Sequence, residues 1–361
     1  MKFGTLHKYR KAWLNDMKRC CARLILPRKR PGPLQAGTVR KIVFLRDNRK
    51  FGDLIVSTAA FREASRHGLE VGVVVGGAVY AELLAHNSHV DHVHSHGPDL
   101  LDIVRLGWRL RRERYDLAVD FLDAAPTFKR IVLLHLMNPR HALSFNKVPD
   151  SSYDVSLYDA PELSRHASSR NADVLGRLGI GCEETARHYD LPLDPERVAA
   201  ARRFLDGLAH RRTLLLNLAG EGPLRQLSAS QVEAIIAHAR HGDEAFNVVL
   251  TGRREIVEAL TVPGGIPSPF ADFIDAIALA QAADFIVSPD TSMIHVASAF
   301  DRPVVALYQP DNDVVYVNSK VWGPNNPAAI QLFSRDERVS SIANADIVAA
   351  MRQMFEGAAR A

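Results

Sequence analysis

Polar residues of the types that hold a phosphate gather directly after a buried strand. The apolar run 284–288 reads as that strand, and residues 289–295 open an apolar helix. A helix that starts beyond the carboxyl end of a parallel strand offers unpaired backbone N–H groups and the positive end of its dipole, which suits a diphosphate. The candidate ligand residues are Asp290, Thr291, Ser292, Met293 and His295. Capping of the helix by Asp290 or Thr291 explains the same residues without a ligand.

A second polar turn follows the first apolar strand of the chain, residues 41–45. The basic residue Arg46 stands after this strand, and Gly52-Asp53 opens a helical run at residues 54–66. A carboxylate at this end of a strand can act as a general base. Asp53 is also explained as a charge that complements the helix dipole, and the two explanations are compatible.

Together the two turns resemble glycosyltransferase family 9, the bacterial heptosyltransferases of lipopolysaccharide core assembly. The likeness is carried by the basic residue after the first strand, by Gly-Asp at the start of a helix, and by the run Asp-Thr-Ser-Met-Ile-His-Val-Ala-Ser-Ala at residues 290–299. Residues 115–120 and 302–308 resemble two further strands of the family. The resemblance extends over residues 40–355 and implies a glycosyltransferase.

The resemblance implies an α/β fold of the GT-B class, in which two Rossmann-like domains face a cleft and a C-terminal helix returns to the first domain. The expected segments are a basic amphipathic N-terminal arm (1–36), an acceptor-binding domain (37–195), a nucleotide-sugar-binding domain (196–340) and the C-terminal helix (341–361). This helix is expected to begin at Asn344 and to stop at Gly357. Alternating apolar runs agree with parallel βαβ units. The expected strands are residues 41–45, 70–75, 92–95, 117–121, 213–218, 246–250, 284–288 and 303–308.

The implied reaction transfers a heptose with inversion from ADP-heptose to a lipopolysaccharide inner-core acceptor, without a cofactor or a metal. Asp53 is the implied general base, Gly52 leaves room for the acceptor, and Arg46 lies on the acceptor side. The diphosphate of the donor is expected at residues 290–295.

Two further residues are assigned to the donor. Arg225, in the loop after the expected strand 213–218, is the candidate cation for the diphosphate because an arginine can make a bidentate contact. Glu255 is the candidate for a bond to the ribose. A solvated surface position is the alternative for each of these residues.

The chain departs from the family pattern at several positions. It has one residue more between Arg46 and Gly52 than is usual, and Leu224 occupies the position of a usual Lys. A common Pro and two usual Gly residues are replaced at Ala59, Ser292 and Gln309. The alternatives to ADP-heptose transfer are therefore a family member that uses another nucleotide sugar, and an inactive GT-B protein that only binds.

The histidine-rich segment 86–96 is the candidate for a metal site. His92, His94 and His96 would share one face of a strand, but no carboxylate or Cys stands at a convincing ligand spacing. Neutral imidazoles at the edge of a sheet explain the run as well. No Gly-x-Gly-x-x-Gly follows the first strand and no Gly-x-x-x-x-Gly-Lys occurs, which argues against a nicotinamide dehydrogenase and a P-loop kinase.

Composition agrees with a protein made of two α/β domains. The chain has 361 residues, of which 47% are hydrophobic, enough for two separate cores. Cys20, Cys21 and Cys182 show no metal-ligand spacing and predict a reducing, cytoplasmic environment. No apolar run reaches the roughly 20 residues of a membrane span, and no signal-peptide core is evident. The expected location is the cytoplasmic side of the membrane.

The basic charge of the chain is concentrated in its first forty residues. Residues 1–40 contain eleven Lys or Arg and the single acid Asp16, a net +10, which leaves −6 for the remainder of a chain whose total is +4. Apolar residues recur there at near-helical spacing, at Phe3, Leu6, Trp13, Leu14, Met17, Cys21 and Leu24. This pattern predicts a helix on the anionic inner face of the cytoplasmic membrane. The alternatives are a helix that folds back on the protein and a disordered basic tail. Nucleic acid is not expected, because no aromatic-basic motif of a known module occurs.

Overall fold

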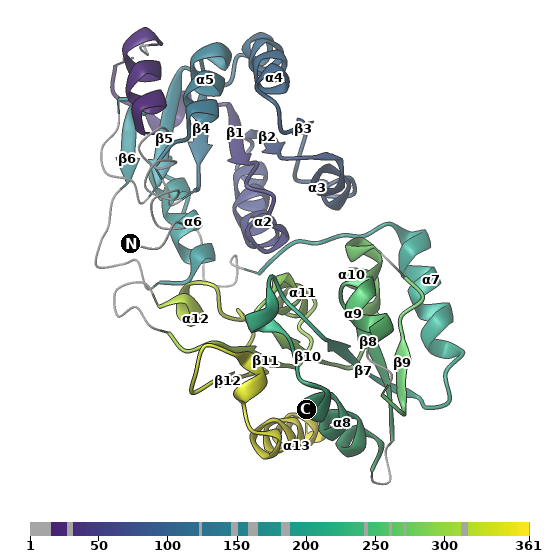
Figure 1. The fold of residues 1–361 in the computed structure, drawn as a ribbon. Helices are drawn as coiled ribbons and strands as arrows, with labels where there is room; N and C mark the ends of the chain where they lie inside the picture. Colours follow the sequence, from purple (N-terminus) through teal and green to yellow (C-terminus); the bar gives the residue numbers. More distant parts are fainter. Residues whose placement is uncertain are drawn as a thin grey trace, which may run out of the picture. The chain divides into compact units, whose positions relative to one another are not determined.

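Two six-stranded parallel sheets, one in each of two units, organise the computed structural model (Figure 1). The first unit comprises residues 1–50, 57–163 and 168–187, and the second comprises residues 51–56, 164–167 and 188–361. The structure describes residues 16–26, 32–122, 125–145, 151–157, 165–181, 188–241, 245–259, 262–270, 272–311 and 317–360.

In the first unit, long runs of β-branched and other apolar residues form the central strands. Every residue after the first in β1 and β2 is buried, as in parallel strands that helices cover on both faces. The strand order is β3-β2-β1-β4-β5-β6, with all pairs parallel. The strands are β1 (Lys41–Arg46), β2 (Glu70–Val75), β3 (His92–Ser95), β4 (Leu117–Asp120), β5 (His141–Phe145) and β6 (Val155–Leu157). The helices are η1 (Ala36–Thr38), α2 (Phe51–Arg66), α3 (Ala78–Leu83), α4 (Leu100–Glu113), α5 (Phe128–Met137) and α6 (Ala167–Gly176).

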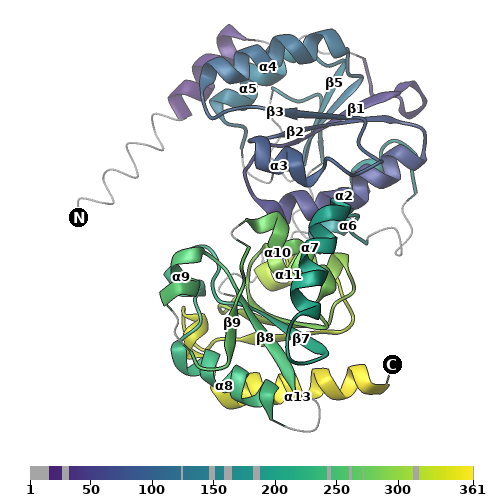
Figure 2. The ribbon, with the colours of Figure 1, turned by 90° about the vertical axis from the view of Figure 1, so that its right-hand side faces the viewer.

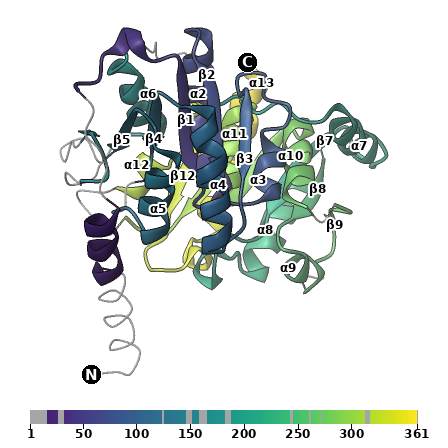
Figure 3. The ribbon, with the colours of Figure 1, turned by 90° about the horizontal axis from the view of Figure 1, so that it is seen from above.

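Helices α4 and α5 pack against each other and against the sheet of the first unit (Figures 2 and 3). Ile103, Leu106 and Leu110 point from α4 into the core that Val43 and Leu45 of β1 share. A glycine allows the two helices to approach closely. A Cβ added at Gly107 of α4 would lie 2.6 Å from the Cβ of Leu136 of α5.

The second unit repeats this architecture. Its strand order is β12-β11-β10-β7-β8-β9, again with all pairs parallel. The strands are β7 (Arg212–Asn217), β8 (Phe246–Thr251), β9 (Gly265–Pro267), β10 (Phe285–Pro289), β11 (Val304–Tyr308) and β12 (Ala329–Phe333). The helices are α7 (Pro195–Asp206), η3 (Pro223–Arg225), α8 (Ala229–Arg240), α9 (Arg254–Ala259), α10 (Phe273–Ala282), α11 (Ser292–Ala299), α12 (Asn318–Val321), η4 (Val339–Ser341) and α13 (Asn344–Arg360).

Each sheet has one point at which the chain changes its direction of travel across the strands. In the first unit this point lies between β1 and β4, and in the second it lies between β7 and β10. The loops that leave the carboxyl ends of such a strand pair turn away from each other and open a crevice, where parallel α/β sheets bind their ligands. Ligand-binding residues are therefore expected at these two crevices.

The C-terminal helix uses its apolar face inside the second unit. Ile347, Met351 and Met354 of α13 are buried in the core formed with α8 and the sheet of that unit. These side chains pack within the second unit, of which the helix is part. The helix begins at Asn344 as predicted, but it continues through Gly357 to Arg360, so the predicted stop at Gly357 is wrong.

All eight expected strands are present, and four further strands were not expected. Those four, β5, β6, β9 and β12, are short and lie on the outer side of the sheets or next to an edge. Three of them are only partly buried, so their sequences lack the continuous apolar run of a central strand.

Only part of the predicted N-terminal arm falls within the described residues. Residues 16–25 are helical, whereas residues 1–15 and 27–31, with Phe3, Leu6, Trp13 and Leu14, lie outside them. Within the described parts of the chain, no helix is both long enough and apolar enough to cross a bilayer.

Candidate functional site

A short polar network lies at the carboxyl edge of the sheet between β7 and β10. The side-chain amide of Asn217, the last residue of β7, donates to Ser288 Oγ at 3.0 Å and to Thr291 Oγ1 at 3.1 Å. Thr291 Oγ1 in turn accepts from the backbone N–H of Met293 at 3.1 Å and caps α11. The helix therefore begins at Ser292, directly behind β10, as the sequence predicts, and its first N–H groups are held at the carboxyl edge of the sheet.

Arg225 lies against this helix start. Its Nη2 is 3.1 Å from Asp290 Oδ2, and its Nη1 donates to the backbone carbonyl of Asp290 at 3.3 Å. A carboxylate next to a diphosphate would repel it, and the ion pair offsets that charge. The guanidinium retains contact with solvent, since the side chain of Arg225 is 32% exposed. The structure thus brings together Arg225, Asp290, Thr291, Ser292 and Met293.

The loop that carries Arg225 is held in place by its backbone. Ala219 and Gln226 form an antiparallel bridge, and the N–H of Gly220 donates to the carbonyl of Arg225 at 2.8 Å. A Cβ added at Gly220 would lie 2.8 Å from Thr291 Cγ2 and 3.1 Å from the carbonyl oxygen of Asp290. A glycine at this position is therefore what allows the loop to approach the start of α11.

Two of the departures from the family pattern meet at this loop. Gln309, at a position where the family usually has Gly, accepts from Arg225 Nε at 3.1 Å through Oε1 and donates to the carbonyl of Glu337 at 2.6 Å through Nε2. Leu224, at the position of the usual Lys, is 37% exposed. Gln309 and Asp290 together therefore fix the guanidinium of Arg225.

His295 lies one turn into α11 and is buried. Burial lowers its pKa to about 3, with a smaller contribution from the nearby His166. Its ring meets those of Tyr189 and Trp322 edge-on, with centroids 6.1 and 6.2 Å away. The imidazole is thus neutral near pH 7, and it can offer a hydrogen bond but no charge to a ligand.

The helix start at Gly52-Asp53 also contributes to the second unit, which includes residues 51–56. The N–H of Gly52 donates to Ser292 Oγ at 3.1 Å, so the serine that replaces a usual Gly accepts a hydrogen bond. A Cβ added at Gly52 would lie 2.8 Å from Cδ2 of His295. Asp53 is partly buried in the first turn of α2, where its charge complements the helix dipole.

Glu255 is not part of this group. It lies in the first turn of α9, whose ion pair joins Arg254 to Glu258 at 2.7 Å. Arg46, the last residue of β1, is not open to a ligand either. It is 3% exposed, donates to Ser57 Oγ at 2.6 Å and lies over the ring of Phe121. Its guanidinium is therefore part of the core of the first unit.

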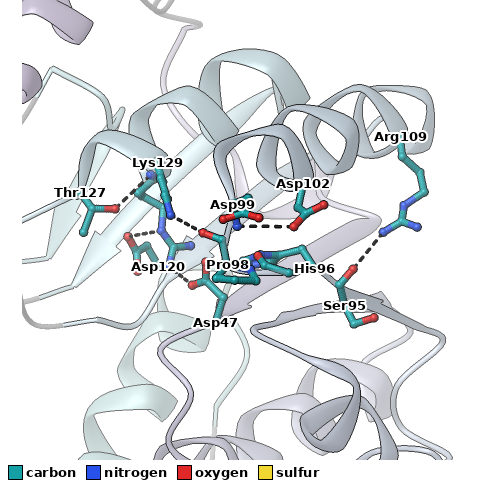
Figure 4. Close-up of polar contacts among 12 residues, drawn as sticks. Asp47, Ser95, His96, Pro98, Asp99, Asp102, Arg109, Asp120, Thr127 and Lys129 are labelled. Carbon is teal, nitrogen blue, oxygen red and sulfur yellow. Dashed lines mark hydrogen bonds and ion pairs between the residues drawn. The ribbon is translucent and has the colours of Figure 1, made fainter.

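The crevice of the first unit, between β1 and β4, contains a buried charge network that the sequence did not indicate (Figure 4). Asp47 follows β1, and Asp120 ends β4. Arg130 of α5 is ion-paired with Asp47, and its Nε lies 3.5 Å from Asp120 Oδ2. His96, just after β3, places Nε2 3.2 Å from Asp47 Oδ2, and Tyr153 donates to Asp120. The available signal was that Asp47, Asp120 and His96 each stand at the carboxyl end of a strand.

This network fixes the loop between β1 and α2. Burial alone would raise the pKa of Asp47, but the charge of Arg130 and the bond to His96 lower it to about 2, so the pair is ionised. Arg49 in the same loop has the left-handed φ of 57°, and its carbonyl accepts from Tyr80. A Cβ at Gly76 would lie 2.6 Å from the carbonyl oxygen of Asp47. The loop is therefore held by one residue in the left-handed region and by a close approach of two backbone segments.

The other histidines of the segment 86–96 have separate partners. His92 lies 2.8 Å from Glu70, and His94 lies 2.8 Å from the hydroxyl of Tyr115. Burial lowers the pKa of His94 to about 4, so its ring is neutral near pH 7. Among the described residues no three His, Cys, Asp or Glu side chains are grouped as a metal site. An Asp-x-Asp run, against the expectation that the chain has none, occupies residues 311–313; its described residue Asp311 accepts from the N–H of Ser319 at 3.1 Å.

Comparison of the sequence with known proteins identifies the family of the chain. The family model of glycosyltransferase family 9 (heptosyltransferase) matches residues 103–339. The Escherichia coli (strain K12) protein "Putative lipopolysaccharide heptosyltransferase 4" is 24% identical over 348 residues, covering 95% of this chain and 95% of that protein.

The fold is also similar to that of solved structures from this family. The glycosyl transferase family 9 protein from Veillonella parvula DSM 2008 has a TM-score of 0.72 at 16% identity, with 88% of this chain and 97% of that chain covered. The E. coli ADP-heptose LPS heptosyltransferase II has a TM-score of 0.69 at 18% identity, with 88% and 99% covered. The two parallel sheets have the fold of these proteins, as the sequence predicted. The chain belongs to glycosyltransferase family 9, the heptosyltransferase family, and is a glycosyltransferase.

Proposed function

We propose that the chain transfers a heptose, with inversion and without a metal ion, from ADP-heptose to a lipopolysaccharide inner-core acceptor. The observation that carries the proposal is the position of Arg225 against the Asp290–Thr291 turn at the start of α11. It combines a cation with the positive end of a helix dipole at the crevice where parallel sheets bind ligands. Both stabilise the negative charge that a diphosphate gains as it leaves the sugar. A similar fold in a heptosyltransferase named for ADP-heptose supports this donor.

The proposed chemistry is a single displacement. The acceptor oxygen attacks the anomeric carbon from the face opposite the diphosphate, the bond to the diphosphate breaks, and ADP leaves with the electron pair. Asp53 accepts the proton of the acceptor hydroxyl. Gly52 is assigned to the acceptor side, and His295 acts on the donor side as a neutral hydrogen-bonding group.

The donor and the metal requirement are tested together. Purified protein is incubated with ADP-heptose and an inner-core acceptor, with and without EDTA, and the anomeric configuration of the product is determined by NMR. We expect an inverted linkage at an unchanged rate in EDTA. Activity that EDTA abolishes and a divalent ion restores would contradict the metal-free mechanism.

Nucleotide titration and the transfer assay together distinguish two alternative functions. A family member for another nucleotide sugar would bind ADP no better than UDP in isothermal titration, whereas we expect ADP to bind more tightly. An inactive binding protein would bind a nucleotide without transferring any sugar. The observation that favours an inactive binding protein is Leu224 at the position of the usual Lys.

The proposed location is the inner face of the cytoplasmic membrane, reached through the basic arm at residues 1–36. Binding of the arm to anionic lipid should weaken as salt rises. Co-sedimentation with anionic vesicles compares the full chain with a chain that starts at Gly37. We expect the full chain to sediment more strongly, and equal sedimentation would contradict a role for the arm.

A further inference from the structure

The outward face of α4 is apolar and exposed. The inward face of this helix supplies Ile103, Leu106 and Leu110 to the core of the first unit. On the opposite side, Leu101 is 65% and Trp108 is 53% exposed, and two turns separate them along one stripe. Large apolar side chains that are exposed together on one helix face are typical of a surface that contacts a partner.

The same face is strongly basic. Four exposed arginines of the helix lie on this face or beside it: Arg105 and Arg112 share the stripe of Leu101 and Trp108, and Arg109 and Arg111 flank it. Two acids of the helix lie near these arginines: Asp102 is 3.5 Å from Arg105, and Glu113 is bound by Lys41 at 2.9 Å. Arg111 lies 5.6 Å from the centre of the Trp108 ring. Positive charge therefore surrounds the two exposed apolar side chains, and it complements an anionic surface.

A second exposed apolar surface belongs to the same unit. In the helix of residues 16–25, Leu24 is 82% and Ile25 is 74% exposed, and Lys18 is exposed beside them. The other side of this segment is tied to the unit, because Ala22 is buried and Leu26 packs on the core that α4 shares. Figures 1 and 3 place this helix and α4 at the same end of the first unit.

We infer that the outward face of α4, with Leu101 and Trp108 among its arginines, is a docking surface for an anionic lipid bilayer. An aromatic and a leucine within a basic helix face is the composition of helices that lie in the lipid interface. Arginine contributes because it binds phosphate head groups while its stem and its neighbours remain in apolar surroundings. The inference rests on the proposed function only for the lipid-borne acceptor, to which this surface would bring the protein, and it adds a second membrane contact to that of the predicted arm.

The test uses the full chain and vesicles of phosphatidylglycerol and phosphatidylethanolamine. The variant Arg105→Gln/Arg112→Gln removes two charges from this face, and Arg335→Gln/Arg352→Gln removes two exposed charges from the second unit as a matched control. We expect the lipid partition coefficient to fall on the order of tenfold for the first pair and less than twofold for the control. Equal binding by the two variants would overturn the inference, because the arm alone would then account for any membrane contact.

A second readout reports on the position of Trp108 itself. The emission of the full chain and of Trp108→Phe is compared on vesicles with and without brominated lipid, so that the difference isolates this side chain. We expect quenching that is clearly smaller in Trp108→Phe, where only the predicted contact of Trp13 in the arm remains, and weaker binding for Leu101→Ser than for Phe333→Ser, a change at an exposed apolar residue of the second unit. Unquenched Trp108 emission on bound protein would contradict the docking surface. Vesicle binding needs no donor, so failure of heptose transfer and failure of docking are separate results.

Discussion

Asp47 and Arg130 form a buried ion pair at the crevice between β1 and β4 of the first unit. The side chain of Arg130 is 4% exposed and that of Asp47 is 16% exposed. The pair holds the start of the loop that leads from β1 to α2 and hence to Asp53. Its contribution is therefore both to stability and to the position of the proposed base.

Removal of one partner should destabilise the protein strongly. Asp47→Asn leaves Arg130 buried beside Asp120 alone, and the loss of one charge from a buried pair costs about 3 kcal/mol or more. Urea unfolding measures this difference. The control is Glu258→Gln, which breaks the exposed pair with Arg254 and should cost less than about 1 kcal/mol.

The effect of Asp47→Asn should also depend on pH. The pKa of Asp47 is about 2 in the folded state and near 3.9 when unfolded, so the pair stabilises fully above about pH 4 and its contribution is lost as the pH falls toward 2. The gap between the wild type and Asp47→Asn should thus narrow below pH 4. A gap that is constant down to pH 2 would show that the charge of Asp47 is not what stabilises the loop.

The buried ring of His295 should make stability fall with acid in a different range. Its folded pKa of about 3 lies below the unfolded value near 6.5, so its contribution is complete above about pH 6.5 and decreases as the pH falls toward 3, by at most about 1.4 kcal/mol per pH unit. His295→Gln cannot be protonated and should lose this part of the pH dependence in guanidinium unfolding at pH 7.5 and 5. Replacement of the exposed His241 by Gln is the control and should leave the difference between the two pH values unchanged.

The sequence predicted the central strands and the start of α11 because their signals are local. A continuous apolar run followed by Asp290-Thr291 specifies a strand and a capped helix within a few residues. The contacts that complete both crevices are not local. Arg225 bonds Gln309 across 84 positions, and Arg130 bonds Asp47 across 83. No periodicity or spacing pairs such residues, since only the fold of the sheets brings them together.

Arg225 should determine the affinity for the donor's nucleotide. Arg225→Ala removes the cation at the start of α11, and charged hydrogen bonds of this kind change binding on the order of tenfold to a hundredfold. Isothermal titration with ADP measures the change, with the exposed Arg335→Ala as the control. Gln309→Gly, which restores the usual family residue, leaves the Asp290 contacts of Arg225 and should weaken ADP binding only about two- to fivefold. Unchanged ADP affinity in Arg225→Ala would show that Arg225 is a solvated surface residue that does not bind the nucleotide.

Asp53 should separate catalysis from binding and from folding. If its carboxylate accepts the acceptor proton, Asp53→Asn keeps the shape of the side chain but lowers turnover by about a hundredfold or more, because the interaction is made in the transition state. The affinity for ADP should stay within about twofold, since the donor's diphosphate contacts are assigned to Arg225 and α11. The competing explanation is a charge that only stabilises the N-terminus of α2, which predicts a loss of about 0.5 kcal/mol of stability with turnover preserved. Glu196→Gln, in the first turn of α7, changes a comparable helix charge and provides the control for that effect. Near-normal turnover in Asp53→Asn together with reduced stability would assign the residue to the helix and require another base.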